Sequence, residues 1–176
     1  AGVNYNGIWA ALGEPMSAFA VHKQDFHVAG SDASGIVWAV GRKVTRVKPG
    51  DEVVIHCNQD DGDDEECNGG DPMFSPSQRI WGYETPDGSF AQFCRVQARQ
   101  CMPRPKHLTW EESACYTLTL ATAYRMLFGH RPHIVKPADN VLVWGASGGL
   151  GSFGVQLCAV TGANAIGVVG SDDKKE

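Results

Sequence analysis

Short apolar runs broken by Gly, Pro and Asp fill the chain up to about Pro105. They predict β-strands at residues 35–41, 46–57 and 88–97, the second entered through a Pro-Gly-Asp turn. The apolar run at residues 3–13 also has a strand-like pattern, with two asparagines that could be turn residues at its end. Several short strands with such turns indicate a small barrel or sandwich.

The pattern changes near Leu108, where the apolar positions take a helical spacing. A helix is predicted over residues 108–130, with Thr109 as its N-cap and Glu112 in capping-box spacing. Residues 140–170 then have the pattern strand, glycine turn, helix, strand, which predicts one βαβ unit that begins a parallel sheet. The predicted fold class is therefore mixed α/β, with a β-rich domain at 1–115 and a βαβ domain at 116–176.

Three glycines are spaced G-x-x-G-x-x-G where the predicted strand of this βαβ unit meets its helix. Glycines at this junction allow a tight turn and a close approach of the backbone to a pyrophosphate, and the helix N-terminus attracts the phosphates. A tight turn without a ligand is the alternative. The residues predicted to bind a dinucleotide here are Gly145, Ser147, Gly148, Gly149, Leu150 and Gly151.

The end of the second strand of the βαβ unit indicates which dinucleotide binds. A site for NAD usually has an acidic residue there for the ribose 2′-hydroxyl. This chain has Gly170 and Ser171 instead, with Lys174 nearby. A hydroxyl and a cation suit a 2′-phosphate, so we expect NADPH, bound in part by Ser171 and Lys174. Asp172 and Asp173 leave a solvated helix N-terminus as the alternative.

Composition and charge exclude several classes of protein. Six of the 20 acidic residues lie between residues 60 and 66, and the remainder nearly balance the 15 Lys and Arg. We therefore expect no nucleic-acid surface. No apolar run approaches the roughly 18 residues of a membrane helix, and we expect no signal peptide. The six cysteines form no C-x-x-C pair, so we expect buried free thiols in a reducing cytoplasm.

The acidic segment has part of the spacing of a calcium-binding loop. Asp64, Glu66, Asn68 and Gly69 fit the first half of an EF-hand, but Ser75 occupies the position of its bidentate Glu. No Cys or His spacing matches a standard zinc site either. A solvated loop is the preferred interpretation, and no metal is expected.

The segments GSDASGIVWAVG, KPGDEVV, TAYRML and VWGASGGLG together resemble the medium-chain dehydrogenase/reductase superfamily. The resemblance implies part of a GroES-like catalytic domain, followed by the start of a Rossmann domain that binds NADPH, in a segment of a longer protein. Zinc-binding members carry a Cys near Asn4 and a His–Glu pair near Ser31 and Asp32. This chain lacks both and resembles the zinc-free branch.

NYN, IWGYETPDGSFAQF, PKHLTWEE and LTLATAYRML further resemble the crotonyl-CoA carboxylase/reductase family. That resemblance implies a cytoplasmic tetramer that uses NADPH and carbon dioxide to convert an enoyl-CoA, crotonyl-CoA, into ethylmalonyl-CoA. The carbon dioxide pocket of that family uses an asparagine that matches Asn6 and an aromatic–glutamate pair that matches Tyr83 and Glu84. Tyr83 departs from the phenylalanine expected there. Thr122 matches a hydroxyl near the nicotinamide.

Carbon dioxide is small and uncharged, so directed hydrogen-bond donors in a dry pocket would have to hold it. The Asn6 amide can donate without protonating an enolate, and a Glu84 carboxylate could order a water. Related enoyl-thioester reductases have a proton-donating tyrosine after this asparagine. Residues 7–16 contain none, although Tyr5 is close.

Other interpretations stay open at this point. Without the resemblance, Asn6 would be a turn residue, Glu84 a surface carboxylate and Thr122 a mid-helix threonine. The chain could instead belong to a zinc-independent NADPH enoyl-thioester or quinone reductase that does not carboxylate. It could also be a non-catalytic structural segment.

Overall fold

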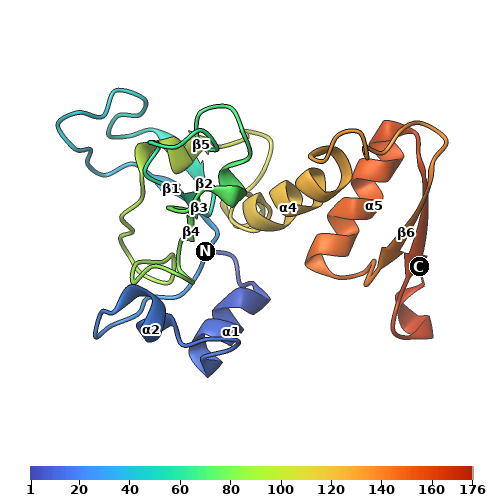
Figure 1. Cartoon of the computed structure of the whole chain (residues 1–176), viewed down its shortest axis with the longest axis horizontal. Coiled ribbons are helices and arrows are strands. Elements are labelled where there is room, and N and C mark those ends of the chain that lie inside the picture. Colours follow the sequence, from blue (N-terminus) through green and yellow to red (C-terminus); the bar gives the residue numbers. More distant parts are fainter. Residues whose placement is uncertain (176) are drawn as a thin grey trace. The chain divides into compact units, whose positions relative to one another are not determined.

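The structure is a computed structural model, and it describes residues 1–175 (Figure 1). The chain divides into two compact units, Ala1–Thr117 and Leu118–Glu176. This division lies close to the expected boundary between residues 115 and 116. The assignment of the two units as domains stays a prediction.

The strand-like interpretation of residues 3–13 is wrong, because they form helix α1 (Tyr5–Leu12). Asn4 precedes the helix in an extended conformation, and Gly13 ends it with φ 75°. Asparagine is a favoured N-cap, and a left-handed glycine is a favoured C-terminal residue. The glycine end signal and the alanines within the run favour a helix. A second helix, α2 (Ala18–His22), follows.

The core of the first unit lies on a three-stranded antiparallel sheet with the order β1-β2-β5. Its strands are β1 (Ala33–Ile36), β2 (Glu52–Ile55) and β5 (Cys101–Pro103). The prediction for β2 is confirmed, and Gly50 in the preceding turn has φ 90°. The core cluster comprises Ala33, Val53, Ile55, Trp81 and Cys101.

Two other strand predictions need correction. The strand predicted at 35–41 is only partly right, because β1 ends at Ile36 and Trp38 is 78% exposed. Residues 88–97 are all described and form no strand. Their glycine, Gly88, lies so close to the carbonyl oxygen of Val28 that a Cβ would approach it to under 3.0 Å. The backbone there packs across another loop instead of extending along a sheet.

Shorter elements complete the first unit. A two-stranded antiparallel ribbon joins β3 (Asn58–Gln59) and β4 (Arg79–Ile80). Two 3-10 helices, η1 (Pro72–Phe74) and η2 (Ala98–Gln100), lie in the loops. The predicted long helix is two helices, α3 (Trp110–Ser113) and α4 (Thr117–Phe128). The capping box is confirmed, since the Thr109 hydroxyl accepts from the Glu112 N–H and the Glu112 carboxylate accepts from the Thr109 N–H.

The βαβ prediction for the second unit is confirmed. Strand β6 (Asn140–Trp144), helix α5 (Gly149–Thr161) and strand β7 (Asn164–Val168) follow one another, and the two strands pair in parallel. A 3-10 helix, η3 (Asp172–Lys174), follows β7. Among the described residues, no helix combines the length and the apolar character that crossing a membrane requires.

All six cysteines are free thiols, as expected, but they are not all buried. Cys57, Cys101 and Cys158 are buried, whereas Cys94 and Cys115 are exposed. Burial, together with the negative charge of Asp32, raises the pKa of Cys57 to about 12. This thiol is therefore protonated at neutral pH and is a poor nucleophile.

Candidate active site

The two asparagines at the start of α1 are hydrogen-bonded to two consecutive residues that precede β1. Nδ2 of Asn4 donates to Oδ2 of Asp32 at 2.8 Å, and Nδ2 of Asn6 donates to Oγ of Ser31 at 2.7 Å. Ser31 and Asp32 are 1% and 0% exposed. Zinc-binding members of the superfamily are expected to carry metal ligands at these positions. In this chain the same positions are joined by hydrogen bonds between amide, hydroxyl and carboxylate groups.

The Asn6 amide keeps unused hydrogen-bonding capacity. It has two N–H donors and a carbonyl oxygen, and only one N–H is needed for the bond to Ser31. The Oδ1 atom of Asn6 is buried, and it has no hydrogen-bond partner among residues 1–175. A buried polar atom without a partner is uncommon, and it is a reason to look for a ligand.

Residues 28–30 connect this cluster with the turn that contains Tyr83 and Glu84. The N–H of Val28 donates to the carbonyl of Pro86 at 2.9 Å. Gly82 has φ 73°, and a Cβ there would approach the carbonyl oxygen of Gly30 to under 3.0 Å. The two loops therefore touch through their backbones, at a place where only glycine fits.

The hydroxyl of Tyr83 donates to the carbonyl of Glu14, just beyond the end of α1, at 2.9 Å. The polar group that distinguishes Tyr83 from the expected phenylalanine therefore has a partner. Oε2 of Glu84 accepts the N–H of Ile80 at 2.7 Å, and both side chains are half-buried. The turn that carries them packs against the segment that leads to Ser31. The joint action of Asn6, Tyr83 and Glu84 as one pocket stays a prediction.

Tyr5 lies outward on α1. Its side chain is 72% exposed, and its ring lies 6.2 Å from that of Trp9, centroid to centroid. The half-buried Asn6 amide, by contrast, contacts the interior residue Ser31. Tyr5 is therefore poorly placed to donate a proton beside Asn6.

In the second unit, the turn between β6 and α5 has the geometry of a phosphate cradle. Gly145 has φ 66°, and a Cβ at Gly151 would approach the carbonyl oxygen of Gly145 to under 3.0 Å. Gly148 precedes α5 in an extended conformation, so the first N–H groups of the helix, from Gly149 onward, are available to an anion. A cavity of about 420 Å³ is lined by Ser147, Ser152, Gly167 and Lys174, among others. These features fit a dinucleotide.

The end of β7 adds positive charge to that cavity. Lys174 and Lys175 both line it. Nζ of Lys175 lies 2.5 Å from Oδ1 of Asp172, an exposed pair. The charge of Asp172 is thus partly balanced, while Ser171 stands just before η3. The roles of Ser171 and Lys174 toward a 2′-phosphate stay predictions, and Lys175 lies outside the set of residues predicted to bind the dinucleotide.

Thr122 lies on α4, and its hydroxyl donates to the carbonyl of Leu118 at 2.8 Å. This bond to the preceding helical turn is what a threonine in a helix commonly makes. The side chain is exposed. Its proposed place near a nicotinamide stays a prediction.

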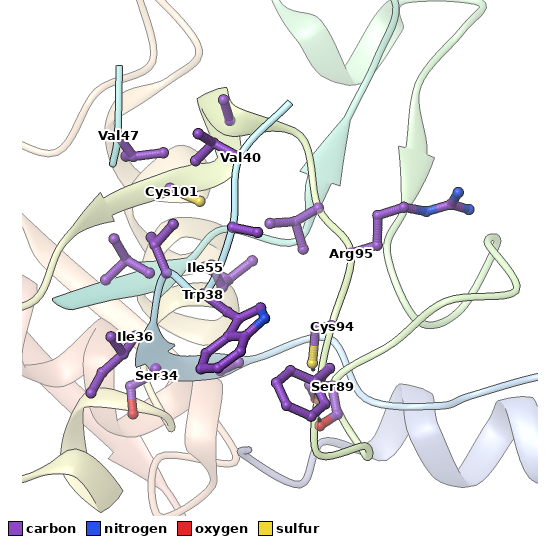
Figure 2. A pocket seen from close by; sticks show the side chains of 18 of the residues that line it. Ser34, Ile36, Trp38, Val40, Val47, Ile55, Ser89, Cys94, Arg95 and Cys101 are labelled. Carbon is purple, nitrogen blue, oxygen red and sulfur yellow. Dashed lines mark hydrogen bonds between the residues drawn. The ribbon is translucent and has the colours of Figure 1, made fainter. Parts of the chain in front are cut away.

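A separate cavity of about 490 Å³ lies in the first unit, between β1 with the segment after it and residues 91–98 (Figure 2). Its lining includes the apolar side chains of Ile36, Trp38, Val40 and Ile55, with Arg95 at one side. None of the three predicted carbon dioxide residues lines it. This cavity is therefore distinct from the cluster around Asn6.

The acidic segment brings possible ligand atoms together, but it carries no further sign of a metal. One atom each from Asp61, Asp64 and Cys67 lie within 4.8 Å of one another. Oγ of Ser75, at the position where an EF-hand has its Glu, donates to Oδ2 of Asp64 at 2.6 Å. The expectation of a solvated loop without a metal stays a prediction.

Comparison with known protein families shows to which family the chain belongs. Residues 1–106 match the alcohol dehydrogenase GroES-like domain family. The chain belongs to that family. The predicted fold class is thereby confirmed: this is a mixed α/β chain with a GroES-like piece followed by the start of a Rossmann sheet.

Relatives of this GroES-like chain place it within the family. The crotonyl-CoA carboxylase/reductase of Cereibacter sphaeroides is 79% identical over all 176 residues, which cover 41% of that protein. A solved crotonyl-CoA carboxylase/reductase, 78% identical, matches 99% of this chain and 41% of its own with a TM-score of 0.96. The chain therefore spans about two fifths of the length of the curated relatives it matches.

A third relative is informative about ligands. The 2-octenoyl-CoA carboxylase reductase CinF, solved in complex with NADP and 2-octenoyl-CoA, is 41% identical. The match covers 99% of this chain and 42% of that one, with a TM-score of 0.94. The resemblance to carboxylase/reductases that the sequence motifs indicated is confirmed.

Sequence reasoning missed Ser31 and Asp32 as parts of the site. The signal that could have revealed them was their position, which matches the His–Glu pair of the zinc-binding members. In the sequence, that position only excluded a zinc site. The hydrogen bonds that Ser31 and Asp32 make in place of a metal are visible only in the structure.

Proposed function

We propose that the protein containing this chain catalyses the NADPH-dependent reductive carboxylation of an enoyl-CoA, with crotonyl-CoA as the reference substrate and ethylmalonyl-CoA as the product. The substrate class is supported by the names of the carboxylase/reductase relatives. A homotetramer, expected from the resemblance, belongs to the same proposal.

The observation that carries this proposal is the pair of hydrogen bonds from Asn4 and Asn6 to Asp32 and Ser31. In a zinc-dependent relative, a metal at these positions would polarise a substrate oxygen. Here an amide with a spare N–H and an unpaired Oδ1 stands in that place. An amide of this kind suits a small, neutral electrophile better than a substrate that needs a Lewis acid.

NADPH, when bound, supplies the hydride that converts an enoyl thioester into an enolate. The N–H groups in the first turn of α5 and the cation of Lys174 would bind its phosphates. The spare N–H of Asn6 would donate to one oxygen of carbon dioxide. Because an amide releases no proton at neutral pH, Asn6 would hold carbon dioxide without quenching the enolate.

Glu84 and Tyr83 would shape the other side of the same pocket. The Glu84 carboxylate already accepts one backbone N–H, which orients it and leaves acceptor capacity for a water molecule. The Tyr83 hydroxyl is engaged with the carbonyl of Glu14. A preorganised pocket closed to bulk water would favour carbon dioxide over a proton as the electrophile.

The direct test uses the full-length enzyme with NADPH, crotonyl-CoA and isotopically labelled bicarbonate. Labelled ethylmalonyl-CoA is the expected product. If the only product is unlabelled butyryl-CoA, the carboxylase proposal fails. Full-length variants Asn6→Leu and Glu84→Ala should lose carboxylation while NADPH still binds, whereas the exposed control Glu111→Ala should behave as the unchanged enzyme.

Simple reduction is the second candidate function. A relative named crotonyl-CoA reductase, from Streptomyces collinus, is 44% identical over 99% of this chain. For a reductase, a proton donor near the α-carbon is required, and neither the outward Tyr5 nor the engaged Tyr83 fits that role. The same labelling experiment separates the two functions.

A further inference from the structure

The Asn4 side chain does not cap its own helix. An asparagine at an N-cap usually accepts a hydrogen bond from an N–H in the first helical turn. In α1 the Asn4 side chain makes no such bond, and it donates to Oδ2 of Asp32 instead. The bond therefore serves to tie the start of α1 to residue 32.

Asp32 is itself fixed from several directions. The N–H of Gly2 donates to its carbonyl at 3.2 Å, in an isolated antiparallel bridge. The hydroxyl of Thr117 donates to its Oδ1, and that same hydroxyl lies 2.7 Å from the carbonyl of Ile55. A fully buried carboxylate held by two side-chain donors and a backbone bridge has little freedom to move.

Ser31 accepts the second hydrogen bond, the one that Asn6 donates. Ser31 directly precedes Asp32, and the two residues bind Asn6 and Asn4, respectively. These asparagines lie on either side of Tyr5, the first residue of α1. The bond from Asn6 to Ser31 sets which way the amide plane faces. Its spare N–H and its unpaired Oδ1 are thereby fixed in direction.

We propose that Ser31 and Asp32 are positioning residues that orient the Asn6 amide for carboxylation. This inference rests on the proposed function. Neither residue needs to touch a substrate: Ser31 holds the amide directly, and Asp32 holds the helix end that carries it through Asn4. A loosened amide would leave the enolate formed but the carbon dioxide unheld, so the product would shift from the carboxylated to the protonated form.

The first experiment uses full-length Ser31→Ala, which removes a hydroxyl with almost no change of volume. The ratio of carboxylated to reduced product should fall about tenfold, the factor that corresponds to one weakened hydrogen-bonded contact. The KM for NADPH should not change. Ser113→Ala is the matched control, because Ser113 is equally buried and its hydroxyl has no partner among the described residues. That control should keep the original ratio.

The second experiment exchanges the two partners of the anchoring bond. Asn4→Asp alone removes the donor and puts two carboxylates face to face, so it should lower the product ratio. Adding Asp32→Asn restores a donor opposite an acceptor, and the double variant should recover at least half of the lost ratio. A role in stability alone would change the melting temperature and leave the product ratio as it was.

The outcomes separate this inference from the proposed function. If the unchanged enzyme makes no carboxylated product, the proposed function fails first. If the enzyme carboxylates but Ser31→Ala keeps its product ratio, the positioning role is overturned while the function stands. Should Asn4→Asp fail to fold, Ser31→Ala still decides the question.

Discussion

The two candidate sites in this chain are built in opposite ways. Around Asn6, buried side chains from segments far apart in sequence meet: the start of α1 contacts residues 31–32, and backbone contacts join that segment to the turn at 82–88. Around Gly145, by contrast, seven consecutive residues form a turn that brings backbone atoms close together. The first site requires the tertiary fold of its unit, whereas the second requires only one turn and one helix end.

This difference predicts which property of the protein a substitution at each site should change. A change in the first unit should affect folding and site geometry together, because the same contacts serve both. A change at Lys174 should affect phosphate binding with little cost in stability. The four predictions below test that separation.

The largest effect is expected for Gly82→Ala in the full-length protein. Gly82 combines φ 73° with a close approach to the carbonyl oxygen of Gly30. An alanine there would be strained by its left-handed backbone and by the clash of its Cβ with that oxygen. We expect a loss of more than about 3 kcal/mol in the free energy of unfolding, measured by urea titration.

Gly50→Ala is the control for the Gly82 variant. Gly50 has φ 90°, but a Cβ there would meet nothing within 4 Å. It should cost only about 1–2 kcal/mol, for the left-handed backbone alone. Equal losses for the two variants would show that the contact between the loops contributes nothing.

The next effect concerns the second unit. Lys174→Gln removes a cation that lines the cavity beside the glycine turn. The KM for NADPH should rise about tenfold, equivalent to about 1.4 kcal/mol, with little change for NADH or in stability. The exposed Lys43→Gln is the control. An equal rise for both nucleotides would argue against a 2′-phosphate contact.

Removing a local hydrogen bond in the first unit should reduce the free energy of unfolding by less than removing a long-range contact. Thr109→Ala removes the side-chain acceptor for the Glu112 N–H at the start of α3. The free energy of unfolding should fall by about 1 kcal/mol, as for other N-caps. Thr109→Ser keeps the acceptor and should restore most of the loss. A loss comparable to that of Gly82→Ala would erase the distinction between local and long-range contacts.

The smallest effect is a dependence on pH that arises in the first unit. Burial lowers the pKa of His56, against a smaller opposing effect of the Asp32 charge, and burial followed by the charge of His22 lowers that of His27. Neutral imidazoles are thus favoured in the folded state, and the unfolded chain takes up protons first. The free energy of unfolding should therefore fall as the pH drops below about 6.5, until the folded-state pKa values are passed.

His56→Asn should flatten that dependence. An asparagine can still accept the N–H of Asn58, which Nδ1 of His56 accepts at 3.1 Å. His27 keeps its own contribution, so the slope should decrease without vanishing. An unaltered slope in His56→Asn would assign the pH dependence to other groups.

The sequence predicted the locally built parts well and the long-range parts poorly. The capping box, the turn before β2 and the βαβ unit all depend on residues a few positions apart, and all three are present. Residues 3–13 were assigned wrongly, because an apolar run of that length suits a strand or a helix equally until its end residues are weighed.

The role of Asp32 could not follow from local pattern at all. Its partners lie 28 and 85 residues away in the chain, at Asn4 and Thr117. Nothing in the sequence around SD distinguishes a buried anchor from a polar turn. The choice of Asn6, Tyr83 and Glu84 likewise came from a resemblance and not from spacing, and it stays a prediction.

The hydrogen bond of Tyr83 determines how well position 83 tolerates a phenylalanine. It joins an exposed hydroxyl to the carbonyl of Glu14, and water can replace the hydroxyl there. An exchange of tyrosine for phenylalanine would therefore cost little, on the order of 0.5 kcal/mol. Tyrosine and phenylalanine are therefore nearly equivalent in stability at this position, and Tyr83→Phe requires no compensating change elsewhere.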